Sequence, residues 1–207
     1  MANAPTASVP GSQSSGAQPT GSRYWIVPIV RAIVAVIPAI VITFSVDHSA
    51  TFGLLVFGAY ALVNGLLLSV LGWRTLGGVS RRLTLIQGIV GIVAGAAALA
   101  LHGGGLAVFL YIVTVWAAVT GFVELYSGLR ARGRSPFARD WTVAGVLTAV
   151  LALVFLLLPP HPVVSVGLLG AYLVVLGVFL AIAGLSLKWA PTDATPVVAA
   201  AQDSDKK

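Results

Sequence analysis

Long stretches without a charged side chain restrict most strongly what this chain can fold into. No Asp, Glu, Lys or Arg occurs in residues 83–123 or 141–187, and residues 48–73 form a third such stretch. One membrane-spanning helix needs about 20 apolar residues. The two longest stretches are therefore too long for one crossing and long enough for two.

Helix-breaking residues lie near the middle of both long stretches. The first contains His-Gly-Gly-Gly at 102–105 and the second Pro-Pro-His-Pro at 159–162, while the earlier apolar segment breaks around Asp47. Glycine and proline at this density end helices. The sequence therefore predicts six helices, at residues 24–46, 51–72, 82–101, 105–129, 141–158 and 162–188.

Composition supports an integral membrane protein. Hydrophobic residues make up 58% of the chain and charged residues 9%, whereas soluble domains are about 45–50% apolar and about 25% charged. These values exclude a soluble enzyme, a disordered protein and an ordinary nucleic-acid-binding protein. The chain also has no cysteine, which excludes disulfides and thiolate metal sites.

An internal repeat organises the apolar region. An aromatic residue recurs at intervals of 56 residues, and a glycine follows each one after five residues. In chain order these repeat packing positions are Tyr60, Gly65, Trp116, Gly121, Tyr172 and Gly177. Glycine permits the close approach of helices on which packing in lipid depends. The alternative to a true repeat is chance recurrence of these residues. The predicted fold is all-α, a polytopic membrane bundle of six transmembrane helices arranged as three repeated helical hairpins.

Polar tails flank this region and set the predicted domain boundaries. Residues 1–22 are rich in Pro, Ser and Gly and are expected to form a disordered cytoplasmic tail, and residues 190–207 form a second polar cytoplasmic tail. The six-helix transmembrane domain covers residues 23–189, with hairpin repeats at about 24–74, 82–130 and 141–188.

The basic residues predict the orientation in the membrane. All twelve precede the first predicted helix, open it, lie in the second and fourth connections, or follow the sixth helix: Arg23, Arg31, Arg74, Arg81, Arg82, Arg130, Arg132, Arg134, Arg139, Lys188, Lys206 and Lys207. Short loops rich in Lys and Arg stay cytoplasmic. We therefore expect a multi-pass protein of the plasma membrane with both termini in the cytoplasm. Its basic surface is expected to meet anionic lipid headgroups rather than nucleic acid.

These features resemble a known family. Three hairpins with glycine and aromatic repeats, six spans, arginine-bearing loops and the sequence Gly-Phe-Val-Glu at 121–124 resemble the HdeD-like acid-resistance membrane proteins over about residues 24–188. Gly65, Gly121, Gly177 and Glu124 match positions of the family pattern. The resemblance implies a bacterial inner-membrane protein connected with survival at low pH, without a defined molecular activity. The long N-terminal tail departs from the family pattern.

Two charged residues lie inside predicted helices. Glu124 is about 9 Å along its helix from Arg130, and Arg31 has a similar depth in the first helix. An ionisable group in a membrane usually finds a partner, so we expect Arg31 and Glu124 to form an ion pair. The alternatives are separate extension of each side chain to the headgroups and a proton relay. Asn64 and Gln87 are expected to support packing by interhelical hydrogen bonds.

The histidines form a second candidate group. His48, His102 and His161 each fall in a different connection on the predicted outer face. Histidine titrates near pH 6.5, so these residues are candidates for a pH-responsive surface. A shared Zn²⁺ ion and simple tolerance of histidine in polar loops are the alternatives.

Motifs for catalysis are missing from the sequence. It contains no phosphate-binding P-loop, no His-Glu-x-x-His and no Gly-x-Ser-x-Gly motif. We expect a non-enzymatic membrane protein that needs no cofactor and contributes to acid or envelope stress tolerance. The alternative is a small oligomeric transporter or channel for protons or small solutes. Its expected partners are the bilayer, a second copy of the chain or another membrane protein.

Overall fold

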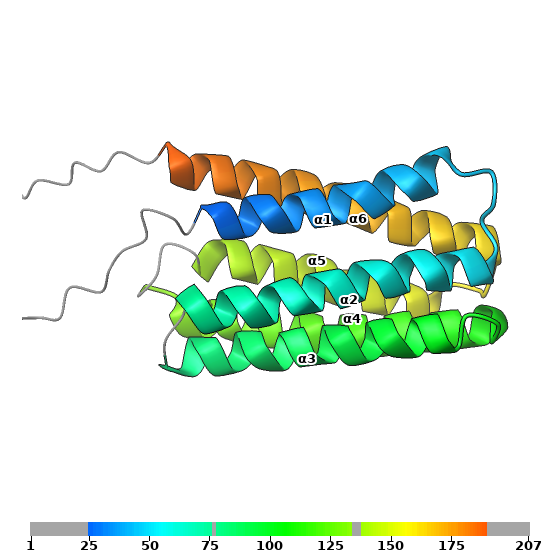
Figure 1. Cartoon of the computed structure of the whole chain (residues 1–207), viewed down its shortest axis with the longest axis horizontal. Helices are drawn as coiled ribbons and strands as arrows, with labels where there is room; N and C mark the ends of the chain where they lie inside the picture. Colours follow the sequence, from blue (N-terminus) through cyan, green and yellow to red (C-terminus); the bar gives the residue numbers. More distant parts are fainter. Residues whose placement is uncertain (1–24, 76–77, 134–137, 190–207) are drawn as a thin grey trace, which may run out of the picture.

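Six long α-helices make up the computed structural model, which describes residues 25–75, 78–133 and 138–189. They are α1 (Ile26–Phe44), α2 (Ala50–Thr75), α3 (Gly78–Ala100), α4 (Gly105–Ala131), α5 (Ala138–Leu157) and α6 (Pro162–Lys188). Their axes follow one long direction (Figure 1). The predicted all-α bundle of six helices is confirmed. Each helix is long and apolar enough to cross a membrane, so the chain is a multi-pass membrane protein.

Two predicted helix starts were too late. α3 begins at Gly78 rather than residue 82, and α5 begins at Ala138 rather than residue 141. The end of an apolar stretch is not the end of a helix, because arginine is a good helix former and continues the helix beyond the apolar residues. The predicted tails, 1–22 and 190–207, lie outside the described residues, as do Arg23, Arg134, Lys206 and Lys207.

The two ends of the bundle differ in chemistry. α1 begins and α6 ends at one end, where α2, α3, α4 and α5 also carry their basic residues; we call this the arginine end (Figure 1). The connections that hold His48, His102 and His161 lie at the opposite end, which we call the histidine end.

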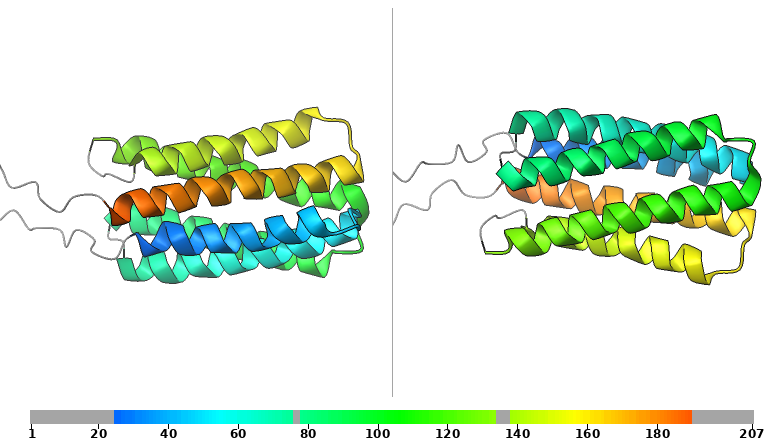
Figure 2. Two further views of the ribbon diagram at one scale, coloured as in Figure 1. Left: turned by 90° about the horizontal axis from the view of Figure 1, so that it is seen from above. Right: turned by 90° about the horizontal axis from the view of Figure 1, so that it is seen from below.

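The three predicted hairpins pack together into a closed ring. Each helix contacts the next one along the chain, and α6 contacts α1. The most extensive contacts join α2 to α3, α4 to α5 and α1 to α6, so the closest pairs combine neighbouring hairpins (Figure 2). α2 also contacts α4 and α6 across the ring. The pair formed by α6 and α1 is therefore equivalent to the pairs α2–α3 and α4–α5, although α1 and α6 lie at opposite ends of the chain.

Glycine sets the distance within these close pairs. A Cβ atom on Gly65 would lie 2.6 Å from the carbonyl oxygen of Gly88 on α3, and one on Gly121 would lie 2.7 Å from the amide nitrogen of Ala149 on α5. A Cβ on Gly177 would lie 2.6 Å from Val36 Cγ2 on α1.

The glycines recur every seven residues as well as every 56. The seven-residue series on α2, α4 and α6 are Gly58, Gly65 and Gly72, then Gly121 and Gly128, then Gly170, Gly177 and Gly184. A seven-residue spacing keeps one face of a helix against its neighbour, as in a coiled coil. Small residues along that face bring the two backbones close enough for extensive contact in lipid.

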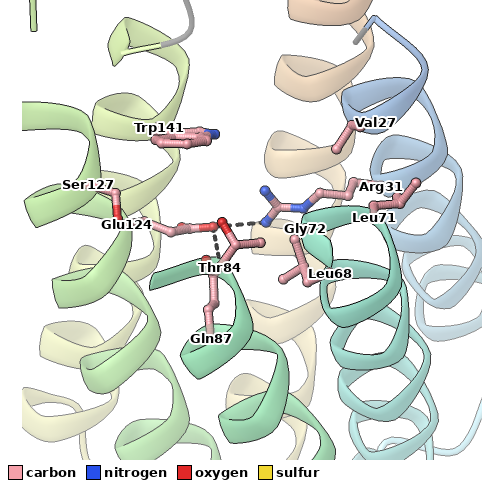
Figure 3. Close-up of a pocket in the computed structure, with 10 residues that line it drawn as sticks. All are labelled: Val27, Arg31, Leu68, Leu71, Gly72, Thr84, Gln87, Glu124, Ser127 and Trp141. Carbon is pink, nitrogen blue, oxygen red and sulfur yellow. Dashed lines mark hydrogen bonds and ion pairs between the residues drawn. The ribbon is translucent and has the colours of Figure 1, made fainter. Parts of the chain in front are cut away.

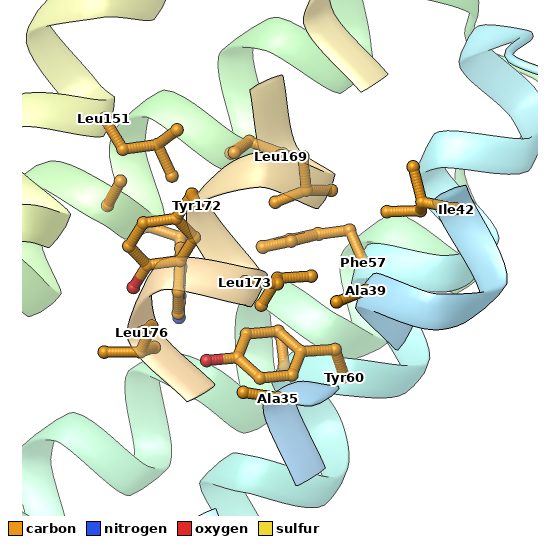
Figure 4. Packing of buried hydrophobic residues seen from close by; sticks show 14 of the residues in the cluster. Ala35, Ala39, Ile42, Phe57, Tyr60, Leu151, Leu169, Tyr172, Leu173 and Leu176 are labelled. Carbon is orange, nitrogen blue, oxygen red and sulfur yellow. The ribbon is translucent and has the colours of Figure 1, made fainter. Parts of the chain in front are cut away.

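Bulky side chains fill the interior between the histidine end and the level of Tyr60, Trp116 and Tyr172. Phe57, Phe109 and Leu169 have no exposed surface. Leu173, which follows Tyr172 by one residue and is equally buried, packs with Phe57 and Leu169 (Figure 4). The ring of Trp116 meets the edge of Phe57 at a centroid distance of 5.2 Å. The described interior is therefore closed by apolar side chains in this half.

We predict that Gly65→Ala destabilises the bundle whereas Gly167→Ala does not. The added methyl group at Gly65 would overlap the α3 backbone, which is expected to cost about 1–3 kcal/mol, but a Cβ at Gly167 meets no atom within 4 Å. Thermal unfolding in detergent, followed by helical circular dichroism, measures both variants. Equal melting temperatures for the two would refute the proposed role of the glycine contact.

Candidate functional site

Polar side chains are present in the interior despite the apolar character of the helices. Eight of them are buried among the described residues: Arg31, Asn64, Gln87, Thr120, Glu124, Ser127, Thr148 and Ser165. A polar group buried without a hydrogen-bond partner costs free energy. The partners of these residues therefore indicate how the interior is organised, and three of them, Arg31, Gln87 and Thr148, contact Glu124.

An ion pair joins α1 to α4. Arg31 Nη2 donates a hydrogen bond to Glu124 Oε1 at 2.8 Å, and the two side chains are 8% and 4% exposed. The structure thus brings together the two charged residues that the sequence singled out. Their side chains meet in the interior instead of extending separately to the bundle surface.

Gln87 donates to the same carboxylate oxygen from α3. Its Nε2 lies 2.6 Å from Glu124 Oε1 and is buried. The sequence predicts an interhelical hydrogen bond for Gln87, which the structure shows, but it does not identify Glu124 as the partner. The repeat contains the signal that would have found it, because Gln87 follows Arg31 by one repeat interval of 56 residues.

The second carboxylate oxygen faces α5 and α6. Thr148 Oγ1 lies 3.4 Å from Glu124 Oε2 and 2.9 Å from the hydroxyl of Tyr172, and it also lies 2.9 Å from the carbonyl oxygen of Ala144, to which it donates. A threonine hydroxyl has one hydrogen but accepts others. Tyr172 can therefore donate to Thr148, which makes this repeat aromatic part of the polar cluster as well as of the core.

Glu124 departs from the pattern of its own repeat. The positions 56 residues before and after it are Leu68 and Leu180, and all three residues are 4% exposed. Leucine satisfies the packing of this layer in two copies. A buried ion pair is often no more stabilising than apolar side chains of similar volume. Packing alone therefore does not account for the carboxylate in the middle copy.

A small cavity adjoins the ion pair. It has a volume of about 30 Å³, and its polar and aromatic lining comprises Arg31, Thr84, Gln87, Glu124, Ser127 and Trp141 (Figure 3). The Trp141 side chain, from the first turn of α5, lies over Glu124 and lines this cavity. Pockets for organic ligands measure about 300–1,000 Å³, so this cavity has room for water-sized molecules and not for an organic substrate.

The three histidines do not form a metal site. His48, His102 and His161 share one end of the bundle, and the Nδ1 atom of His102 donates to the carbonyl oxygen of Leu99 at 2.9 Å. Across residues 25–75, 78–133 and 138–189, no three His, Cys, Asp or Glu side chains are grouped closely enough to hold a metal ion. The described structure therefore gives no support to the zinc alternative.

Basic side chains at the arginine end contact aromatic rings. Arg81 Cζ lies 3.4 Å from the centre of the Trp73 ring, and Lys188 Nζ lies 5.2 Å from that of Trp25. Arg130 Nη1 donates to the hydroxyl of Tyr126 at 3.1 Å. Aromatic and basic side chains of this kind are typical of the boundary between lipid and water.

We predict that exchanging Arg31 and Gln87 preserves the bundle although Arg31→Gln alone does not. The single variant leaves the Glu124 carboxylate buried without a cation, which is expected to cost about 3–5 kcal/mol. The double variant Arg31→Gln/Gln87→Arg supplies the cation from the equivalent repeat position, against the same oxygen atom. Thermal unfolding of the wild type, both single variants and the double variant measures the coupling. Strictly additive losses in the double variant would contradict the proposed equivalence.

Comparison with known proteins supports the repeat. The model of a family described as "Short repeat of unknown function (DUF308)" matches residues 30–100 and again residues 86–157. The two matches start 56 residues apart and overlap within α3, which closes the first unit and opens the second. No curated protein and no solved structure matches the chain. Because the two matches together extend over more than half of the sequence, this six-helix membrane protein belongs to the DUF308 repeat family.

Proposed function

We propose that this protein is a non-enzymatic component of the plasma membrane that contributes to tolerance of acid or envelope stress. The observation that carries the proposal is the closure of the described bundle by Phe57, Phe109, Leu169 and Leu173, none of which has exposed surface. A closed bundle favours a structural role over passage of a solute. The connection with acid comes from the resemblance to HdeD-like proteins. Membership of the DUF308 repeat family is consistent with that resemblance.

The orientation is part of this proposal. Arg74, Arg81, Arg82, Arg130 and Arg132 gather at the arginine end, whereas the connections at the histidine end contain no Lys or Arg. Under the positive-inside rule the arginine end faces the cytoplasm. Its basic and aromatic side chains are then placed to meet anionic headgroups, each basic residue contributing about 1 kcal/mol of attraction.

The ion pair supplies the internal support in this proposal. Arg31, Gln87 and Thr148 reach Glu124 from three helices, and each of these side chains is buried. A polar cluster shared by several helices penalises their separation, because any displaced member loses its partner in a low-dielectric interior. We infer that the cluster keeps the arginine half of the ring assembled under stress.

A small oligomeric transporter or channel is the second candidate function. The cavity beside Arg31, Gln87 and Glu124 favours it, since intramembrane charges often mark pathways for protons or ions. Closure of the histidine half by bulky side chains weighs against it. The two candidates predict different behaviour when the charges are removed together.

We predict that Glu124→Gln lowers acid survival and protein level, and that Arg31→Gln/Glu124→Gln restores both. The single variant leaves a buried guanidinium without a counter-ion, at a cost of about 3–5 kcal/mol, whereas two neutral amides can hydrogen-bond to each other. Survival of a deletion strain at low pH, complemented by each variant, is compared with the amount of protein in the membrane. A double variant that is present at the wild-type level but fails to restore survival would contradict the structural role and favour a proton relay.

We predict that the purified protein does not carry protons or small solutes across a bilayer. Liposomes that contain the protein and a pH-sensitive dye are exposed to a pH step, with protein-free liposomes and a known protonophore as controls. The closed histidine half predicts proton flux equal to that of protein-free liposomes. A flux that depends on the protein and disappears with Arg31→Gln/Glu124→Gln would overturn the proposed function and favour the transporter.

A further inference from the structure

The guanidinium of Arg31 has a polar atom that no protein group satisfies. Arg31 is 7% exposed, and its Nε atom is buried without a hydrogen-bond partner, although Nη2 is bonded to Glu124. An N–H group left unsatisfied in a protein interior costs about 1–3 kcal/mol, and more when it is charged. Such atoms in native proteins usually bond to internal water.

Two small cavities with space for water are lined by Arg31. The cavity of about 30 Å³ that adjoins Glu124 is lined by Arg31, and so is a second cavity of about 20 Å³. A cavity needs about 10–15 Å³ to hold one water molecule, together with polar partners. Thr84, Gln87 and Ser127 supply polar groups in the first cavity, and Asp140 does so in the second.

The two cavities lead toward the arginine end. Both are lined by Val27, Arg31 and Trp141, and the second one extends to Asp140 and to Leu187, close to the ends of α5 and α6. Figure 3 shows the Trp141 ring across the cluster from the cavity-lining residues of α2 and α3. Trp141 is therefore placed to separate the ion pair from the water at this end.

Packing closes the opposite direction. Thr120 lies one helical turn from Glu124 toward the histidine end. It is 3% exposed, its Oγ1 atom is buried without a hydrogen-bond partner, and it lines neither cavity. Farther along α4, Val113 and Phe109 have no exposed surface. The two cavities are therefore bounded on this side by close-packed side chains.

We propose that the two cavities are a water-binding site that connects the Arg31–Glu124 pair to the arginine end and leaves it isolated from the histidine end. The ligand is water, held by the free N–H of Arg31 and the polar groups of α3, α4 and α5. The ion pair therefore exchanges water with one compartment alone. This inference is independent of the proposed stress function, because it concerns access to the cluster and not its effect on the cell.

The absence of cysteine from the chain makes the proposal directly testable. Ser127→Cys places a thiol on the cavity wall, and Thr120→Cys is its matched control, seven residues earlier on the same face of α4. Each variant is reconstituted in lipid nanodiscs, where both ends meet water, and exposed to Ag⁺, a thiol reagent close in size to a water molecule. After unfolding, a fluorescent maleimide measures the thiols that Ag⁺ did not reach.

We expect Ser127→Cys to react at least about tenfold faster than Thr120→Cys, because a sealed thiol reacts only after a local opening. Thr84→Cys repeats the measurement from α3 and is expected to behave like Ser127→Cys. Equal slow reaction of the cavity variants and Thr120→Cys would overturn the water site. Equal fast reaction would overturn isolation from the histidine end.

A second substitution tests the route. Trp141→Ala in the Ser127→Cys background removes the ring between the cavity and the arginine end, and the reaction with Ag⁺ is expected to accelerate by about tenfold or more. The same substitution is expected to leave Thr120→Cys slow. An unchanged rate for Ser127→Cys would refute access through Trp141, provided that the melting temperatures confirm a folded bundle.

Discussion

A helix in lipid gains almost nothing by hiding an apolar side chain against another helix, because the lipid tails that it replaces are equally apolar. Association must then come from close contact along the backbone. In this protein glycine supplies that contact at Gly65, Gly121 and Gly177, each of which faces another helix with no room for a side chain. The three close helix pairs, and with them the ring, depend on this constraint.

Closure of the ring explains why one polar cluster can exist. Arg31 is on the first helix and Glu124 on the fourth, and they meet because α1 returns to α6 and completes the circle. Gln87 reaches the same oxygen from the repeat position equivalent to that of Arg31. The symmetry of the repeat thus directs side chains from several helices toward one place in the interior. The carboxylate of Glu124 occupies that place.

A comparison of Glu124 with its two equivalent positions separates the needs of packing from those of function. Leu68 and Leu180 occupy the positions equivalent to Glu124 and are equally buried. A chain built for packing alone could use leucine three times. The carboxylate, its contacts with Arg31, Gln87 and Thr148, and the adjoining cavity give the arginine half a polar interior. In the histidine half, Phe57, Phe109 and Leu169 fill the interior with bulky apolar side chains. This asymmetry along the axis is the basis of both proposals.

The sequence by itself determined the number of helices, their approximate limits and the repeat interval, because the length of a membrane span and the effect of Gly and Pro on helices are local properties. It also singled out Arg31 and Glu124, since a charge within an apolar stretch is conspicuous. It did not show that α3 and α5 begin before their arginines, because a charged segment next to an apolar stretch can be either helix or loop.

Only the tertiary structure decided which helices pack most closely, that Gln87 and Thr148 share the carboxylate, and that Trp141 turns inward. The physical reason is that each of these contacts joins two different helices, so it depends on how the helices are oriented toward one another. A repeat interval indicates which residues are equivalent, but the direction in which each helix faces is set by the closure of the whole ring.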